Sequence, residues 1–504
     1  MPTGCGSPVP ATGPSSRPRS KHCARSWWTT PEACANHSWG VRRATDEALR
    51  GGAGQCSTEE QGTDGRSHGN RGRHVGGGAG AGLDARTALA RLLTNRDFMI
   101  VWGGFTVSSV GTALSNLAVP ILALGLSGSP SMAGLVGAAR LAPYLLLNLL
   151  AGVFIDRWDR RRVMIVADLG RFAALATIPI AYTFDSLTIV HLAAVAFLEG
   201  VGHVFSAVSH LSALSQLVPQ EQLASANALN EVADSAAGVG GSALSGALIG
   251  LARNSTLGAV YSYAVDAVTY LLSGASLLFV RKSFQEERPA DEQRSVMADL
   301  KEGMSFLWRQ RLLRLLMVMV TLINFLQAPL NLATIVLATK DLDFNAGLIG
   351  LILAAVGLGT VVSAFAASWL RERISLRTMA LGSVALWAVA AAMMAAAPSI
   401  VPLAAGVLIT NLLWPIFAVS LVTYRLTATP DHLQGRVNSA FRTLSFGVEP
   451  LGLAIGGALI ASQGPRFLFW GAAVGLFAIF LGSVATWRGT LTPETAAAAS
   501  TEEA

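Results

Sequence analysis

Four ionisable side chains fall in the middle of long apolar stretches of this chain: Arg140, Glu199, Asp266 and Glu449. A charged group inside a lipid bilayer is costly, so such a residue is a functional candidate by default. A carboxyl that gains and loses an arginine partner can take up and release a proton. We expect proton coupling at Glu199 or Glu449, with Asp266 as a further candidate and Arg140 as the counter-charge. A static interhelical ion pair is the alternative.

Two more charged residues, Asp168 and Arg171, stand three positions apart, which places them on one face of a helix. We expect them to form a latch or a structural ion pair. His203 follows Glu199 by four residues and shares its helix face. A core histidine and a proton relay both fit this position.

The composition requires a membrane around these charges. Only 13% of the residues are charged and 52% are hydrophobic, whereas about 25% of a soluble globular chain is charged. Helices of about 20 apolar residues span the hydrocarbon core, because every backbone N–H must be bonded within the segment. This pattern excludes a soluble multidomain protein and predicts an all-α membrane protein of twelve spans. The expected helices are Phe98–Leu124, Met132–Phe154, Val163–Tyr182, Leu187–Ser209, Asn227–Leu251, Leu257–Val280, Leu312–Leu337, Gly347–Leu370, Met379–Ala397, Val401–Val422, Ser439–Ala461 and Phe467–Trp487.

The tails and the connector differ from this apolar region. Residues 1–86 are rich in Gly, Ser, Arg, Thr and Pro and hold all four cysteines, so we expect a disordered tail, or a start placed too far upstream. Apolar residues at helical spacing between residues 282 and 311 favour an amphipathic surface helix over a plain solvated linker. The expected division is a disordered tail (1–86), an N-terminal six-helix bundle (92–281), a cytoplasmic connector (282–311), a C-terminal six-helix bundle (312–488) and a disordered C-terminal tail (489–504).

Lysine and arginine gather in alternate loops, as they do on the cytoplasmic side of membrane proteins. They follow the second, sixth, eighth and tenth expected helices, whereas 127–131, 183–186 and 397–400 have none. Both termini are therefore expected in the cytoplasm. The net charge of +6 includes +4 from residues 1–86, where 11 Lys and Arg face 7 Asp and Glu, and does not suggest a nucleic-acid partner.

The chain repeats itself at an offset of 211 residues. Pro219 corresponds to Pro430, Asn227 to Asn438, and the run GALI recurs at 246 and 457. Two six-helix copies have the same orientation and are related by an axis along the membrane normal, which suits a carrier whose halves rock around a central site.

The run Gly152–Arg162 reads GVFIDRWDRRR and resembles the signature loop of the major facilitator superfamily, with Asp159 at the position of the usual second glycine. The runs LLTNRDF at 92–98, LVP at 217–219 and GRV at 435–437 resemble the bacterial drug:proton antiporter branch, which includes macrolide-efflux and siderophore-export proteins. Gly241 is followed by Ser242 where antiporters often carry Gly-Pro. The resemblance implies two pseudo-symmetric six-helix bundles and a gating loop of Gly152, Asp156, Arg157, Arg160 and Arg161.

Aromatic and amide side chains on several expected helices could line a cavity for an amphipathic substrate. The candidates are Trp102, Phe105, Tyr144, Asn324, Gln327, Asn331, Asn411 and Trp414. The sequence has no phosphate-binding loop, no Gly-x-Ser-x-Gly elbow and no His-rich metal set, so we expect no enzyme activity, no cofactor and no metal.

These observations favour a secondary active transporter that works by alternating access. It is expected to be a proton-coupled exporter of a hydrophobic or amphipathic small molecule, such as a drug, a macrolide-like compound or a siderophore. An importer or lipid flippase on the same fold, or a non-transporting membrane sensor, stays open. We expect a monomer in the bacterial inner membrane, with the small molecule, the proton gradient and the lipid bilayer as its partners.

Overall fold

The computed structural model describes residues 90–282, 284, 296–342, 363, 366–367, 369–430 and 433–488. Both expected tails, most of the expected helix Gly347–Leu370 and part of the connector lie outside these residues. Ten segments of the described chain are long and apolar enough to cross a membrane.

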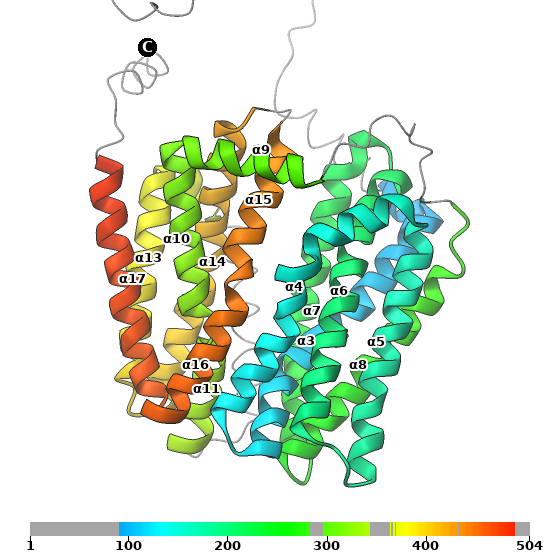
Figure 1. Cartoon of the computed structure of the whole chain (residues 1–504), viewed down its shortest axis with the longest axis horizontal. Coiled ribbons are helices and arrows are strands. Elements are labelled where there is room, and N and C mark those ends of the chain that lie inside the picture. Colours follow the sequence, from blue (N-terminus) through cyan, green and yellow to red (C-terminus); the bar gives the residue numbers. More distant parts are fainter. Residues whose placement is uncertain are drawn as a thin grey trace, which may run out of the picture. The chain divides into compact units, whose positions relative to one another are not determined.

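The N-terminal half consists of six helices (Figure 1). They are α3 (Arg96–Ser127), α4 (Pro130–Arg157), α5 (Arg160–Thr183), α6 (Ile189–Leu217), α7 (Leu223–Leu251) and α8 (Ser255–Leu277). Helix α8 is not among the ten apolar segments. Its buried residues include Ser262, Asp266, Thr269 and Ser273, and it packs along α3 and α5. A helix can cross the membrane with such polar side chains when they face protein rather than lipid.

Besides a short π-helix at Leu337–Asp341, the described part of the C-terminal half contains seven α-helices. They are α10 (Arg311–Gln327), α11 (Leu330–Val336), α13 (Leu376–Ala395), α14 (Ile400–Ala428), α15 (Gln434–Gly447), α16 (Glu449–Gln463) and α17 (Pro465–Arg488). Two expected single helices are broken. The expected helix at 312–337 divides at Ala328–Pro329, and the one at 439–461 divides at Val448, two residues before Pro450. A proline lacks the N–H that would continue the hydrogen-bond ladder.

Helix bounds in the two halves follow the same 211-residue offset as the sequence. Helix α6 spans Ile189–Leu217 and α14 spans Ile400–Ala428, so both ends differ by 211. Helix α7 begins at Leu223 and α15 at Gln434, again 211 residues apart. The repeat is therefore structural, and the described helices form two similar halves.

Capping side chains set several helix starts. Asn95, Thr188, Asn254 and Ser375 each accept a hydrogen bond from a backbone N–H in the first turn of α3, α6, α8 and α13. Such caps satisfy N–H groups that have no partner within the helix.

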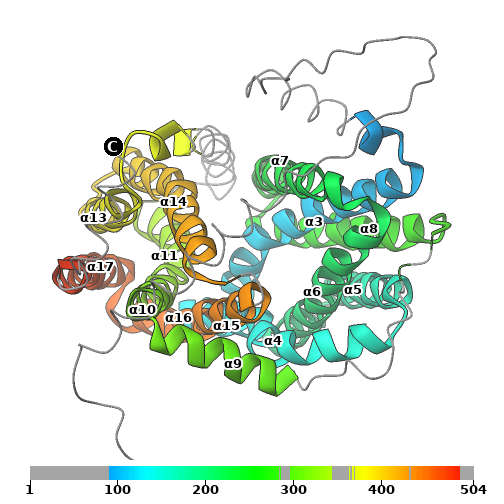
Figure 2. The same cartoon turned by 90° about the horizontal axis from the view of Figure 1, so that it is seen from above.

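One helix lies across the others. Helix α9 (Val296–Arg309) runs crosswise to α10 and α15, which are seen end-on in Figure 2. Gly303 faces α15 so closely that a Cβ would lie 2.5 Å from the carbonyl oxygen of Arg436. Glu302 Oε2 is 2.7 Å from Arg436 Nη1. The connector is thus fixed to the C-terminal half.

The two halves meet through small residues on α4 and α16. A Cβ on Gly134 would lie 2.9 Å from the Cα of Gly457, and a Cβ on Gly457 would lie 2.8 Å from the carbonyl oxygen of Pro130. Near the same end, Lys340 Nζ donates to the carbonyl oxygen of Gly128 at 3.0 Å. Lipid tails are as apolar as the helix surfaces, so the hydrophobic effect does not hold two membrane helices together. Small residues let the helix backbones approach closely, and close packing then stabilises the contact.

Candidate functional site

A cluster of buried charges joins three helices of the N-terminal half. Arg140 Nε on α4 is 2.5 Å from Glu199 Oε2 on α6, and Arg171 Nη2 on α5 is 3.5 Å from Glu199 Oε1. Arg171 Nη1 is also 3.4 Å from Asp168 Oδ1. Glu199, Asp168 and Arg171 are each no more than 4% exposed. Two arginines and two carboxylates therefore form one compact cluster, which we call the charge cluster.

Hydroxyl groups complete the charge cluster. Tyr270 of α8 donates to Glu199 Oε1 at 3.4 Å, and its ring centroid lies 3.7 Å from Arg171 Cζ. Ser273 donates to Asp168 Oδ2 at 2.7 Å. Buried ion pairs are tolerated only when the remaining lone pairs and protons have partners. Helix α8 supplies two such partners for the carboxylates, Tyr270 and Ser273.

Glycines next to the charges bring the helices together. Gly200 follows Glu199, and a Cβ there would lie 3.1 Å from the Pro143 ring and still nearer the carbonyl oxygen of Arg140. A Cβ on Gly202 would lie 2.5 Å from Arg171 Cγ. Gly200 therefore lets α6 approach α4 on one side and Gly202 lets it approach α5 on another, and Glu199 lies between the two arginines.

Asp168 and Arg171 lie inside the helix bundle and share a partner with Glu199. They form an ion pair with each other and contact α6 and α8 of their own half. A latch and a structural ion pair both stay predictions for these two residues.

Asp266 lies apart from these ion pairs. It is fully buried on α8, accepts hydrogen bonds from Ser115 and Thr269, and forms no ion pair within the described chain. Glu449 is half-buried at the first position of α16, directly after the break at Val448. His203 packs beside Tyr144, with ring centroids 5.3 Å apart.

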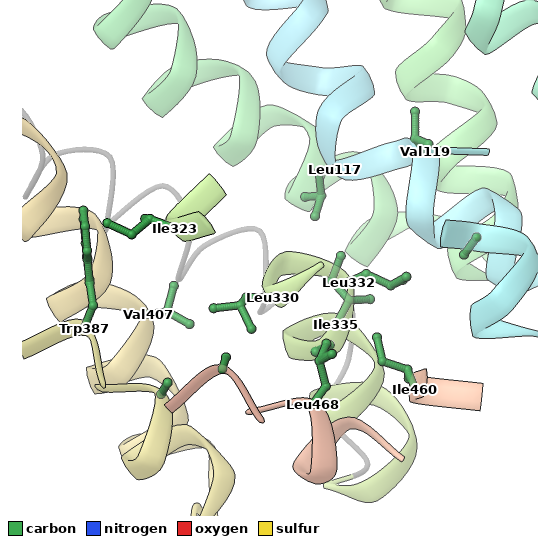
Figure 3. Close-up of a cluster of buried hydrophobic side chains, with 14 of the residues drawn as sticks. Leu117, Val119, Ile323, Leu330, Leu332, Ile335, Trp387, Val407, Ile460 and Leu468 are labelled. Atoms are coloured by element: carbon green, nitrogen blue, oxygen red, sulfur yellow. The ribbon is translucent and has the colours of Figure 1, made fainter. Parts of the chain in front are cut away.

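A cavity of about 460 Å³ lies between the two halves. Its described lining contains amide, hydroxyl and apolar side chains and no charged one. The lining residues are Asn116, Leu117, Ser235, Gly238, Val239, Ser242, Gln327, Leu330, Asn331, Thr334, Met394, Val407, Thr410 and Asn411. We call it the central cavity. Figure 3 shows three of its apolar residues, Leu117, Leu330 and Val407, coming from different helices.

The central cavity contains three of the expected cavity residues, Gln327, Asn331 and Asn411. The other five pack elsewhere. Asn324 donates to the carbonyl oxygen of Ser445 at 2.8 Å, and Trp414 packs beside Trp387 and Phe417.

The remaining three belong to the interior of the N-terminal half. Phe105 stacks on His210 with centroids 4.4 Å apart, and Tyr144 lies beside His203. Trp102 packs against an apolar cluster around Phe98 and Leu277. Their apolar rings gain more from burial against neighbouring helices than from a polar cavity.

Several residues that line the central cavity were not among the residues expected from the sequence. Asn116, Ser235, Ser242, Thr334 and Thr410 are small polar residues in apolar helices. Ser235 and Ser242 stand seven apart and Asn331 and Thr334 three apart, so helical spacing was a usable signal. Two exposed carboxylates on α7, Glu231 and Asp234, were also missed although they lie within an expected span.

The gating-loop residues divide between two helices. Arg160 and Arg161 belong to α5, whose start is three residues earlier than expected because Asp159 accepts hydrogen bonds from the N–H groups of Arg161 and Arg162. Arg161 donates to the carbonyl oxygens of Leu277 and Leu278 at the end of α8, each at 2.8 Å. Gly152 lies within α4, and the side chains of Asp156 and Arg157 lie outside the described residues. Asp159 thus makes a helix cap in place of a glycine turn.

A second, larger cavity of about 790 Å³ lies between α5 and α6. It is lined mainly by apolar residues such as Val166, Leu198 and Phe205. All of its described lining comes from the N-terminal half, so a movement of one half against the other would not open or close it. The central cavity, which both halves line, is the better candidate for cargo.

Two similar halves of membrane-spanning helices, a polar cavity between them and a charge cluster beside it define a transporter of the major facilitator fold. A family model described as transmembrane secretion effector matches residues 87–503, and the chain belongs to this family within the major facilitator superfamily.

Known relatives agree with this assignment. The chain is 25% identical over 398 residues to the multidrug efflux pump Tap of Mycolicibacterium fortuitum, covering 77% of this chain and 94% of that protein. It is 24% identical over 234 residues to macrolide efflux protein A of Streptococcus pyogenes, covering 46% of this chain and 56% of that protein. The chain is therefore a multi-pass membrane transporter of the exporting kind.

Solved structures share the fold. The nucleoside transporter NupG superposes with a TM-score of 0.62 at 12% identity, over 77% of this chain and 99% of that chain. A bacterial homologue of the iron transporter ferroportin in its inward-facing state gives a TM-score of 0.60 at 15% identity, over 80% and 98%.

Proposed function

We propose that this chain exports uncharged or amphipathic small molecules across the bacterial cytoplasmic membrane in exchange for protons, with both termini in the cytoplasm. The observation that carries the proposal is the position of Glu199, a carboxylate between two arginines on three different helices. Two of its relatives are named as multidrug and macrolide efflux proteins, and these names suggest the class of cargo.

The charge cluster provides a way to couple a proton to helix packing. Ionised Glu199 attracts Arg140 of α4 and Arg171 of α5 to α6. A proton on Glu199 removes that attraction and leaves two buried cations with fewer partners, which weakens the packing of the three helices. Proton binding and release at Glu199 would then favour different arrangements of the N-terminal half.

The central cavity fits a cargo with scattered hydrogen-bonding groups on an apolar frame. Its lining mixes amides and hydroxyls with Leu, Val and Met, and such a surface binds amphipathic molecules without a fixed charge requirement. Described contacts between the halves include Gly128–Lys340, Gly134–Gly457 and Leu145–Gly447. With cytoplasmic termini, the first two lie near the outer surface, which supports a cavity that opens toward the cytoplasm in this state.

Transport by everted membrane vesicles tests the proposal. Vesicles with an acidic interior should accumulate radiolabelled erythromycin, and collapse of the pH gradient should abolish the accumulation. Glu199→Gln should lose the gradient-driven component, whereas the matched change Glu302→Gln on exposed α9 should retain it. If neither erythromycin, nor ethidium, nor a ferric siderophore moves in response to the gradient, the proposal is wrong.

A further inference from the structure

Asn116 on α3 belongs both to the lining of the central cavity and to the surroundings of the charge cluster. Its side chain is exposed in the cavity, and its Oδ1 accepts a hydrogen bond from Arg140 Nη1 at 2.5 Å. The same guanidinium donates to Glu199 through Nε, also at 2.5 Å. One planar cation thus joins an amide in the cavity to a buried carboxylate.

We propose that Asn116 is the positioning residue through which cargo in the central cavity acts on the Arg140–Glu199 pair. The inference rests on the proposed function and adds a requirement on the cargo. The cargo presents an uncharged hydrogen-bond donor, such as a hydroxyl or amide N–H, to Asn116 Oδ1.

The coupling follows from the donor geometry of arginine. A guanidinium has five N–H donors in a fixed plane and pairs most strongly with a carboxylate when two of them bind it. When cargo occupies Asn116 Oδ1, that oxygen no longer holds Arg140 Nη1, and the guanidinium is free to turn so that its two parallel donors, Nε and Nη2, both reach Glu199. The pair then changes from one hydrogen bond to two, which favours the ionised carboxylate over the protonated one.

The reverse effect must also hold, because the coupling between two binding sites is reciprocal. Protonation of Glu199 weakens its bond with Arg140, so Arg140 binds Asn116 Oδ1 more firmly. The amide oxygen is then less available to cargo. Cargo and proton thus oppose each other, as exchange of one for the other requires.

Other groups face Glu199, and none of them lies in the described lining of the central cavity. These titratable or charged groups are Arg140 and Tyr144 on α4, Asp168 and Arg171 on α5, His203 on α6, and Tyr263, Asp266 and Tyr270 on α8. In the described chain, the hydrogen bond from Arg140 to Asn116 connects the lining of the central cavity to the groups that face Glu199. Asn411 is a matched residue for comparison, because it lines the same cavity and instead donates to the carbonyl oxygen of Val407 at 2.9 Å.

The test places a known donor in the cavity and follows Glu199 directly. The four native cysteines, at positions 5, 23, 34 and 56, are replaced by serine, and Ser242→Cys in the cavity lining is modified with 2-hydroxyethyl methanethiosulfonate. Infrared titration of the full chain in lipid nanodiscs reports protonation of the Glu199 carboxyl, whose band is assigned by its loss in Glu199→Gln.

We expect the tethered hydroxyl to change the proton concentration that half-protonates Glu199 by about 5-fold or more, the lower end of typical coupling between sites. Asn116→Ala should abolish this effect, and Asn411→Ala should preserve it. If Asn116→Ala does not give a monodisperse protein, Asn116→Ser serves in its place.

Two results would overturn the inference: a tether that leaves the Glu199 titration unchanged, or an equal effect in Asn116→Ala and Asn411→Ala. The vesicle assay judges the proposed function separately. If efflux is driven by the gradient and either of these results is found, the role of Asn116 is refuted and the proposed function stands.

Discussion

Arg140 Nε and Glu199 Oε2 lie 2.5 Å apart although 59 positions separate the two residues in the chain. Their side chains are 12% and 5% exposed, so the pair is almost removed from solvent. The contact exists because Gly200 has no Cβ and α6 can lie against the backbone of α4 at Arg140. An ion pair in these surroundings affects both stability and transport.

Removal of one partner of this pair should destabilise the protein more than removal of both. Arg140→Gln leaves Glu199 with a weaker partner, and loss of one member of a buried pair costs about 3–5 kcal/mol. The double change Arg140→Gln with Glu199→Gln should recover part of the lost thermal stability and should not recover uphill transport. Thermal unfolding in detergent measures the first effect and vesicle accumulation the second. Strictly additive losses of stability would contradict the coupling.

Closure of the halves at α4 and α16 should depend on Gly134. A Cβ there would lie 2.5 Å from the carbonyl oxygen of Leu453, so Gly134→Leu forces α16 away. Efflux should fall at least about 10-fold, which corresponds to about 1.4 kcal/mol. Gly103→Ala on α3 is a control for the loss of a glycine, because nothing lies within 4 Å of a Cβ at that position. Equal efflux by both variants would show that this contact is dispensable.

Helix α9 should leave α15 when Gly303 is enlarged. Gly303→Val introduces a branched side chain where even a Cβ would lie 2.5 Å from the carbonyl oxygen of Arg436. Leu307 on α9 is fully buried, so Leu307→Cys should react slowly with a membrane-impermeant maleimide and faster once Gly303→Val is added. Glu302→Gln should change the rate little, since an exposed ion pair contributes about 0–1 kcal/mol. Unchanged labelling in Gly303→Val would reject this account.

Trp387 should matter more to stability than Trp414. Trp387 is 1% exposed on α13 and donates from Nε1 to the carbonyl oxygen of Thr410 on α14 at 2.9 Å. Trp387→Phe removes this hydrogen bond, at a cost of about 0.5–1.5 kcal/mol, and loses part of a buried ring. Trp414→Phe at a 37% exposed position should cost less. The unfolding midpoints of the two variants in the same detergent compare the costs, and an equal decrease would contradict the prediction.

The helix breaks illustrate how far sequence reasoning extends. Prolines at 120, 143, 179 and 415 lie inside continuous helices, whereas those at 329 and 450 coincide with breaks. A proline therefore does not determine a break by itself. At the two breaks the helices pack against each other, because a Cβ on Gly452 of α16 would lie 2.5 Å from the carbonyl oxygen of Phe325 on α10. That contact joins residues far apart in the sequence.

The sequence by itself determined the membrane-spanning class, the two-half repeat and which charged residues are exceptional. Apolar length, the 211-residue offset and intramembrane charge are properties of local sequence or of its self-similarity, so no packing knowledge was needed. The same rule would have found Glu231 and Asp234 on α7.

The tertiary structure alone decided the partners. It joined Asp168 and Arg171 to Glu199, linked Asn116 to Arg140 and selected Gln327, Asn331 and Asn411 for the cavity. Which face of a helix meets which neighbour depends on small residues such as Gly200 and on helix crossing, and these contacts form between residues that no spacing rule relates. The sequence therefore located the charges and suggested Arg140 as a partner of Glu199, whereas the links of Glu199 to Arg171 and of Arg140 to Asn116 required the fold.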